Sequence, residues 1–267
     1  MKKNSLYIIA IAFLSFSCGE YQKLLKSSDP DLKYNKAIEY FEAEDYMRAQ
    51  TLLDDVTAYY RGTERSEDVL YYLAESYMGQ KDYYSATEYY QTYVKTYPKG
   101  EKTDYCKYMV GYCYYLDSPD SRLDQTSTEN AVLALQEFID IYPESNKVQD
   151  ANKLLEELAD KLAYKEYKNA DLYYNLGNYL GNNYESAIIV SENAIEQYPA
   201  NKYREELLFI ILKAKYQQAL MSVEDRREER YQDAMDEYYA FVTEYPDSKH
   251  QFQLKRIYSD INKVIKD

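Results

Sequence analysis

Four Tyr-Pro dipeptides recur along the chain, and each proline stands twelve residues after an alanine. A fifth alanine, Ala49, is followed twelve residues later by Arg61. Between alanine and proline, apolar residues follow the spacing of one helix face. Because proline cannot continue a helix and biases its predecessor away from the helical region, each Tyr-Pro predicts a helix end. The four pairs are Ala86 with Tyr97-Pro98, Ala131 with Tyr142-Pro143, Ala187 with Tyr198-Pro199, and Ala234 with Tyr245-Pro246.

The segment before Ala86 predicts an antiparallel partner for the helix that ends at Tyr97. Its apolar residues share one helix face, and Gly79 with the polar "QKD" then predicts a tight turn. The residues on that face are Leu70, Leu73, Ala74 and Tyr77. Two antiparallel helices with alanine at their crossing point resemble the tetratricopeptide repeat, a unit of 34 residues, over Leu70–Pro98.

The other segments fit the same unit with insertions, which predicts an all-α solenoid of about five helix-turn-helix repeats and a C-terminal capping helix. Asp29 and Pro30 are expected to begin the first repeat. The polar stretch "SVEDRREER" is expected to be an insert between the helices of repeat five. The predicted organisation is a signal peptide at 1–17, a lipidated tether at 18–30, repeats one to three at 31–145, a long helix with repeats four and five at 146–247, and the capping helix at 248–267.

The N-terminal residues "MKKNSLYIIAIAFLSFS" have a basic start and an apolar stretch that is too short to span a bilayer. They precede Cys18 and resemble a bacterial lipoprotein signal, which implies that Cys18 is acylated and becomes the first mature residue. An ordinary secretory leader with an incidental cysteine is the alternative. If enterobacterial sorting applies, Gly19 implies the outer membrane, and we expect the protein to face the periplasm.

Charge and composition exclude several function classes. The net charge of −14 opposes binding to nucleic acid.

The single histidine, His250, lies in a polar turn and is interpreted as a surface residue. Cys106 and Cys113 lie about 10 Å apart along a predicted helix, too far for a disulfide, and are expected to pack in the core. No phosphate-binding loop, metal site or cofactor site is predicted, and the protein is not expected to be an enzyme.

Binding is therefore the expected role, and a row of mostly aromatic residues is the candidate surface. It lies about a third of a turn from the packing face of the first helix in each of repeats one to three. Tyrosine offers a broad contact area and a hydroxyl group, which suits an extended, aromatic-ended peptide. The alternative is that neighbouring helices bury these rings as ordinary core. The candidate residues are Tyr34, Phe41, Tyr71, Met78, Tyr105, Tyr108, Tyr112 and Tyr115.

The leader, the five repeats, the long helix before the fourth repeat and the Tyr-Pro ends together resemble the BamD family of the outer-membrane β-barrel assembly machinery. The stretches "LAYKEYKNADLYYNLGNYLGNNYESA" and "RYQDAMDEYYAFVTEYPDSKH" are similar to that family's fourth and fifth repeats. The resemblance implies a scaffold without catalysis. Its expected partners are a BamA-like β-barrel component, other assembly subunits, unfolded outer-membrane proteins, and a membrane held through the lipid anchor. A glycan-binding lipoprotein of the SusD type and an envelope factor of the YbgF type remain alternatives.

Overall fold

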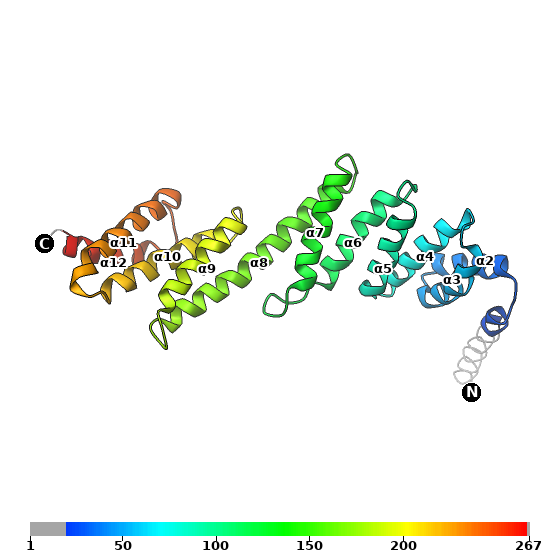
Figure 1. The fold of residues 1–267 in the computed structure, drawn as a ribbon, viewed down its shortest axis with the longest axis horizontal. Coiled ribbons are helices and arrows are strands. Elements are labelled where there is room, and N and C mark those ends of the chain that lie inside the picture. The colour runs from blue at the N-terminus through cyan, green and yellow to red at the C-terminus, as the bar shows by residue number, and fades with distance from the viewer. Residues whose placement is uncertain (1–19, 266–267) are drawn as a thin grey trace, which may run out of the picture. The chain divides into compact units, whose positions relative to one another are not determined.

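The computed structural model describes residues 20–265, which form helices joined by short turns and contain no strand (Figure 1). The all-α prediction is confirmed. Residues 20–25 are helical. The later helices are α2 (Pro30–Glu42), α3 (Tyr46–Tyr60), α4 (Arg65–Gly79), α5 (Tyr83–Thr96), α6 (Thr103–Asp117), α7 (Thr126–Ile141), α8 (Val148–Leu176), α9 (Asn183–Gln197), α10 (Arg204–Leu220), α11 (Glu224–Glu244) and α12 (Gln251–Ile265).

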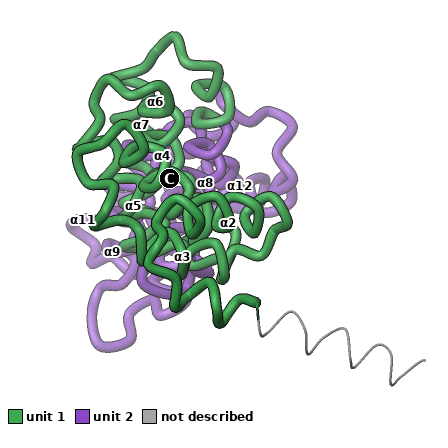
Figure 2. Tube along the Cα trace, turned by 90° about the vertical axis from the view of Figure 1, so that its right-hand side faces the viewer, with its two compact units in different colours: residues 1–118, 126–152 green, residues 119–125, 153–267 purple. Residues whose placement is uncertain are grey.

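The helices form two compact units, coloured separately in Figure 2. Unit 1 contains α2 to α7 and the first residues of α8. Each of its helices from α2 to α6 packs against the next one along the chain. Unit 2 contains the rest of α8, α9 to α12 and the short segment 119–125. Within unit 2, α10 packs against both α9 and α11, and α11 packs against α12.

The predicted helix ends are confirmed by the backbone. The helices α5, α7, α9 and α11 each stop one residue before the tyrosine of a Tyr-Pro pair. In each case the tyrosine N–H still donates to the carbonyl four residues earlier, at 2.8 or 2.9 Å. The proline that follows has no N–H to continue the ladder. The alanine of each segment has no exposed surface, so it permits close approach of the paired helices. These alanines are Ala49, Ala86, Ala131, Ala187 and Ala234.

Helix starts also follow local chemistry. Asp29 accepts a hydrogen bond from the Leu32 N–H at 3.1 Å, and Pro30 is the first helical residue, as predicted. Asp45, Asp82 and Asn182 cap α3, α5 and α9 in the same way.

Two local predictions are wrong. Residues 224–230 are not an insert between helices but the first two turns of α11. They contain no helix breaker, and Arg226 pairs with Glu229 at 3.0 Å across one helical turn. His250 is not a surface residue, because its side chain is only 16% exposed. Its ring stacks on Phe209 at 3.9 Å, and its Nε2 lies 3.1 Å from a Glu206 carboxylate oxygen.

The C-terminal helix α12 buries Leu254, Ile257 and Ile261 against the core of unit 2.

Both Cys106 and Cys113 are buried free thiols in α6, as predicted. Burial raises the pKa of Cys113 to about 12, so its thiol stays protonated at neutral pH. These cysteines therefore act as small core residues.

Candidate peptide-binding surface

The predicted aromatic row lies on α2, α4 and α6 of unit 1, and its positions repeat every 37 residues. Three sets share this period. The first is Tyr34, Tyr71 and Tyr108; the second is Ile38, Glu75 and Tyr112; the third is Phe41, Met78 and Tyr115. Seven of the eight predicted residues are half-buried, and Tyr108 is buried with 6% exposure. The face is therefore partly accessible, and its role in binding stays a prediction.

The three tyrosines of the first set make a recurring contact with the next repeat. A cation from the segment that starts the following first helix lies over each ring. Arg65 lies 5.2 Å from the centre of the Tyr34 ring, Lys102 lies 5.1 Å from that of Tyr71, and Lys147 lies 5.5 Å from that of Tyr108. These rings therefore contribute to packing between repeats as well as to the surface.

On α6 three tyrosines form a stacked ladder. The rings of Tyr108 and Tyr112 have centres 5.9 Å apart, and those of Tyr112 and Tyr115 are 6.1 Å apart, both nearly parallel. Tyr108 also packs edge-on against Phe138 of α7. Burial raises the pKa of Tyr108 to about 12. Its hydroxyl is therefore neutral at physiological pH and can donate a hydrogen bond.

Two members of the third set, Phe41 and Met78, are held by contacts with neighbouring side chains. Phe41 meets Tyr46 and Tyr72 edge-on, at 5.5 and 5.0 Å between ring centres. The Met78 sulfur lies 3.8 Å from the Cys113 sulfur. These contacts hold the side chains in place, which reduces the entropy lost when a ligand binds.

Glu75 is the one charged side chain among the nine positions of the three sets. It accepts a hydrogen bond from the Tyr90 hydroxyl at 2.6 Å and another from the Tyr105 hydroxyl. Burial raises the pKa of its carboxyl above the ordinary value, against the effect of these two hydrogen bonds. Helical spacing in the sequence places Glu75 on this face, between Tyr71 and Met78, but Glu75 was not among the predicted binding residues. The 37-residue period, which aligns it with Ile38 and Tyr112, was the signal that could have singled it out.

Replacing Glu75 with glutamine is expected to raise the melting temperature at pH 7. The folded-state pKa lies above its ordinary value of 4.5, so the ionised form destabilises the fold at neutral pH. As the pH falls through the raised pKa, Glu75 of the native chain gains its proton and the native chain recovers stability. The difference between the two proteins should therefore shrink toward pH 4.5. Circular dichroism melts across this range measure it.

Glu88→Gln is the matched control, because it removes the same charge from an exposed position on α5. It should lack the pH-dependent difference that Glu75→Gln shows. A lower melting temperature for Glu75→Gln at pH 7 would contradict the expectation.

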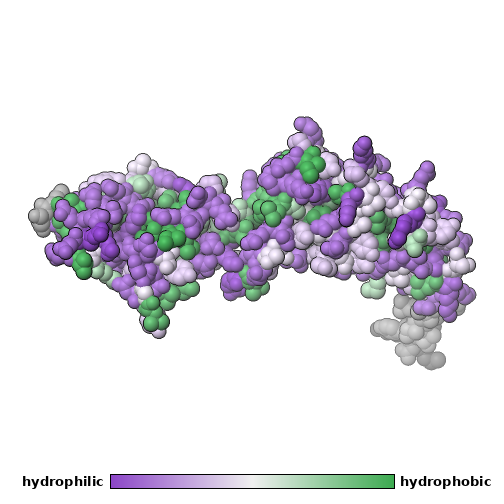
Figure 3. Space-filling model, viewed as in Figure 1, coloured by the Kyte–Doolittle hydropathy of each residue, from purple (hydrophilic) through white to green (hydrophobic). Residues whose placement is uncertain are grey.

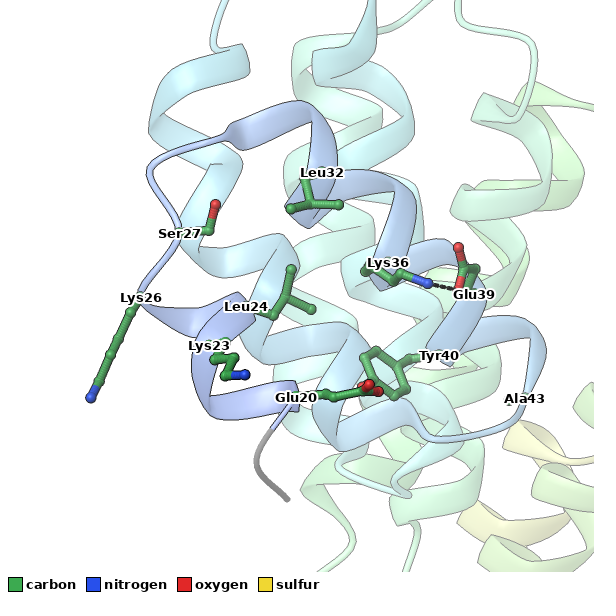
Figure 4. A pocket seen from close by; sticks show the side chains of 10 residues that line it. All are labelled: Glu20, Lys23, Leu24, Lys26, Ser27, Leu32, Lys36, Glu39, Tyr40 and Ala43. Atoms are coloured by element: carbon green, nitrogen blue, oxygen red, sulfur yellow. Dashed lines mark hydrogen bonds and ion pairs between the residues drawn. The ribbon is translucent and has the colours of Figure 1, made fainter. Parts of the chain in front are cut away.

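The predicted lipidation site, Cys18, lies outside the described residues. The first described residues border an open cavity of about 870 Å³ between segment 20–27 and α2 (Figure 4). Leu24, Leu32 and Tyr40 contribute apolar surface to it, and its charged lining residues are Glu20, Lys23, Lys26, Lys36 and Glu39.

Residues 20–265 contain no group of three or more His, Cys, Asp or Glu side chains that could hold a metal ion. Within the same range, no helix combines the length and the apolar character needed to cross a membrane.

Paired antiparallel helices with buried alanines at their crossings define a helical-repeat protein of the tetratricopeptide class. The sequence profile of the family described as "YfiO: Outer membrane lipoprotein" matches residues 27–181, more than half of the chain. The chain belongs to this outer membrane lipoprotein family.

Similar proteins support this family assignment only in part. The chain is 28% identical over 122 residues to the outer membrane protein assembly factor BamD of Caulobacter vibrioides, an alignment covering 46% of this chain and 38% of that protein. The match thus spans well under half of the length of that relative. Two crystal structures of a kinesin light chain with nearly identical TPR-like repeats, from Podosopora anserina, superimpose with TM-scores of 0.33 at 16% identity. The superposition on the first structure, which is a variant with a point substitution, covers 81% of this chain and 95% of the kinesin light chain. The superposition on the second covers 83% of this chain and 100% of the kinesin light chain. This similarity is too low to add to the assignment.

Proposed function

We propose that this protein is a non-catalytic scaffold of outer-membrane β-barrel assembly, anchored by lipid at Cys18 and facing the periplasm. The observation that carries the proposal is the family match over residues 27–181, which includes all of α2 to α7. The C. vibrioides relative is itself an outer membrane protein assembly factor. A scaffold of this kind acts by raising local concentration and fixing the orientation of its partners.

Incoming outer-membrane proteins are the proposed ligands of the face formed by α2, α4 and α6. The half-buried tyrosines there are neutral hydrogen-bond donors on rings that neighbouring side chains hold in place. Unfolded chain segments present backbone carbonyls and apolar side chains, which such a surface can contact.

The barrel component and other assembly subunits are the proposed partners of unit 2. Two of its loops together expose six large apolar side chains, which we term the loop patch. They are Leu176, Tyr179, Leu180, Leu220, Met221 and Val223. The Asn178 amide lies 2.7 Å from the Met221 sulfur, so the two loops are neighbours. Figure 3 shows the loop after α8 as an apolar projection at the lower edge of the view. Exposed patches of this kind mark protein interaction sites.

Placing carboxylates in the loop patch is expected to reduce recovery of the barrel component. Leu180 is 90% exposed at a positive φ of 56°, a conformation that aspartate tolerates better than leucine. Val223 occupies the N-cap position of α11, where aspartate is a preferred residue. The double change Leu180→Asp with Val223→Asp should therefore preserve the fold. Loss of about 2 kcal/mol at the centre of an interface would lower the amount co-purified from solubilised outer membranes more than tenfold.

Phe252→Asp is the control, because Phe252 is 83% exposed on α12 of the same unit but outside the loop patch. It should leave recovery unchanged. Undiminished recovery of the barrel component with the double variant would remove the loop patch from the proposal. Retention of the native protein on glycans, or with division proteins in place of a barrel, would overturn the assembly role.

A further inference from the structure

Glu75 lies at the middle of the aromatic face and has no cationic partner among the described residues. It forms no ion pair with any other residue in the 20–265 range, although many carboxylates of the chain do. Its neighbours in the 37-residue period, Ile38 and Tyr112, are uncharged. An acidic group is thus held at one defined point of a face that is otherwise neutral at these positions.

The carboxylate has spare capacity for a ligand. An ionised carboxylate offers about four acceptor positions. The hydroxyls of Tyr90 and Tyr105 use two of them and orient the group from α5 and α6. Glu75 itself is half-buried, so part of it remains accessible to solvent.

Aromatic rings stand beside this carboxylate. The centres of the Tyr71 and Tyr105 rings are 6.2 Å apart, and the planes are inclined by 58°. Both rings are half-buried. The ring of Tyr71 already has the Lys102 ammonium 5.1 Å from its centre, which shows that its electronegative face accommodates a cation. Carboxylate and ring faces together form the chemistry that recognises an ammonium or guanidinium group.

A purely structural role does not require the negative charge. Glutamine could accept the same hydrogen bonds from Tyr90 and Tyr105 without placing a charge in a partly desolvated position. Burial of Glu75 disfavours its ionised form, as the raised pKa of its carboxyl shows. A residue that destabilises the free protein is expected at sites where a ligand compensates for it.

We propose that Glu75, Tyr71 and Tyr105 form a recognition site for one lysine or arginine side chain of an extended peptide bound to the face of α2, α4 and α6. The inference rests on the proposed function, since it names the chemistry of a client segment. The guanidinium or ammonium group pairs with the Glu75 carboxylate, and its alkyl stem lies against the tyrosine rings.

Two synthetic peptides test this site by fluorescence anisotropy with the full mature chain in detergent. They are identical, aromatic-ended and fluorescently labelled, and differ at one central position that is lysine or the uncharged norleucine. A charge-assisted contact of about 1.4 kcal/mol or more predicts at least tenfold tighter binding of the lysine peptide to the native protein. Glu75→Gln should remove most of that preference by weakening the lysine peptide alone. Glu88→Gln should behave as the native protein, and thermal melts verify that every variant is folded.

Each outcome has a separate meaning. Equal binding of the two peptides to the native protein overturns this inference and leaves the client-binding role intact. Retention of the lysine preference in Glu75→Gln also overturns it. Failure of either peptide to bind counts against both the inference and the proposed peptide-binding face. A lysine preference together with no barrel partner in purification would support the site and overturn the assembly role.

Discussion

A chain in which Cys18 is replaced by alanine behind an ordinary cleavable secretory leader is expected to leave the outer-membrane fraction. The physical reason is the loss of the acyl chains proposed at Cys18, since each of their methylenes contributes about 0.8 kcal/mol when buried in lipid. One chain binds only marginally, whereas two or more give stable anchoring. The variant should therefore appear in the soluble periplasmic fraction.

Fractionation followed by immunoblotting measures this change, with an alkaline wash to strip proteins held only through partners. The native leader with Cys18 intact is the control. A mass spectrum of the native N-terminal peptide should show the added acyl mass. An unmodified Cys18 in that spectrum would contradict lipidation and support an incidental cysteine.

Substituting Gly111 is expected to destabilise unit 1. Gly111 is buried in α6, where it faces α7. A Cβ atom there would lie 2.7 Å from Leu135 Cγ and 3.1 Å from the Leu135 backbone nitrogen. Leu135 has no exposed surface, so its side chain is enclosed by other residues and cannot move outward into solvent. For alanine, the gain in helix propensity is about 1 kcal/mol, and overpacking costs about 1–3 kcal/mol. Overpacking should win, and Gly111→Val should lose more stability than Gly111→Ala.

Denaturant unfolding monitored by tyrosine fluorescence measures both variants, and a double variant identifies the cause. Leu135→Ala alone should lose about 2–5 kcal/mol because it leaves a cavity. In Gly111→Ala with Leu135→Ala, the new methyl group occupies part of that cavity, so the combined loss should be smaller than the sum of the two. Additive losses would show that contact with Leu135 is not the reason for the effect.

Several features of the fold could be predicted because their causes are local. Proline lacks an N–H group wherever it occurs, so the Tyr-Pro pairs mark the ends of α5, α7, α9 and α11 without reference to the rest of the chain. The long helix at 148–176 could be recognised from its uninterrupted helix-forming residues, with no glycine or proline among them. The small crossing alanines were predictable from their fixed distance to each proline, since only a small residue lets two helices approach closely.

The candidate site was predictable only in part. Helical periodicity placed Tyr34, Tyr71 and Tyr108 on the corresponding faces of three helices, since residues three and four apart lie together on any one helix. Periodicity does not say what covers that face. Lys147 and Phe138 come from segments far along the chain, and their packing against Tyr108 makes it the one buried member of the row.

The class of fold, the helix ends and the face on which the tyrosines lie thus follow from local sequence, because each depends on neighbours within a few turns. Three features emerged only once the helices were packed together: which tyrosines also contact the next repeat, the stacking of His250 on Phe209, and the position of Glu75 between two hydroxyls with no cation from the described residues paired to it. Those outcomes depend on burial and on partners from other helices, and a one-dimensional pattern contains neither.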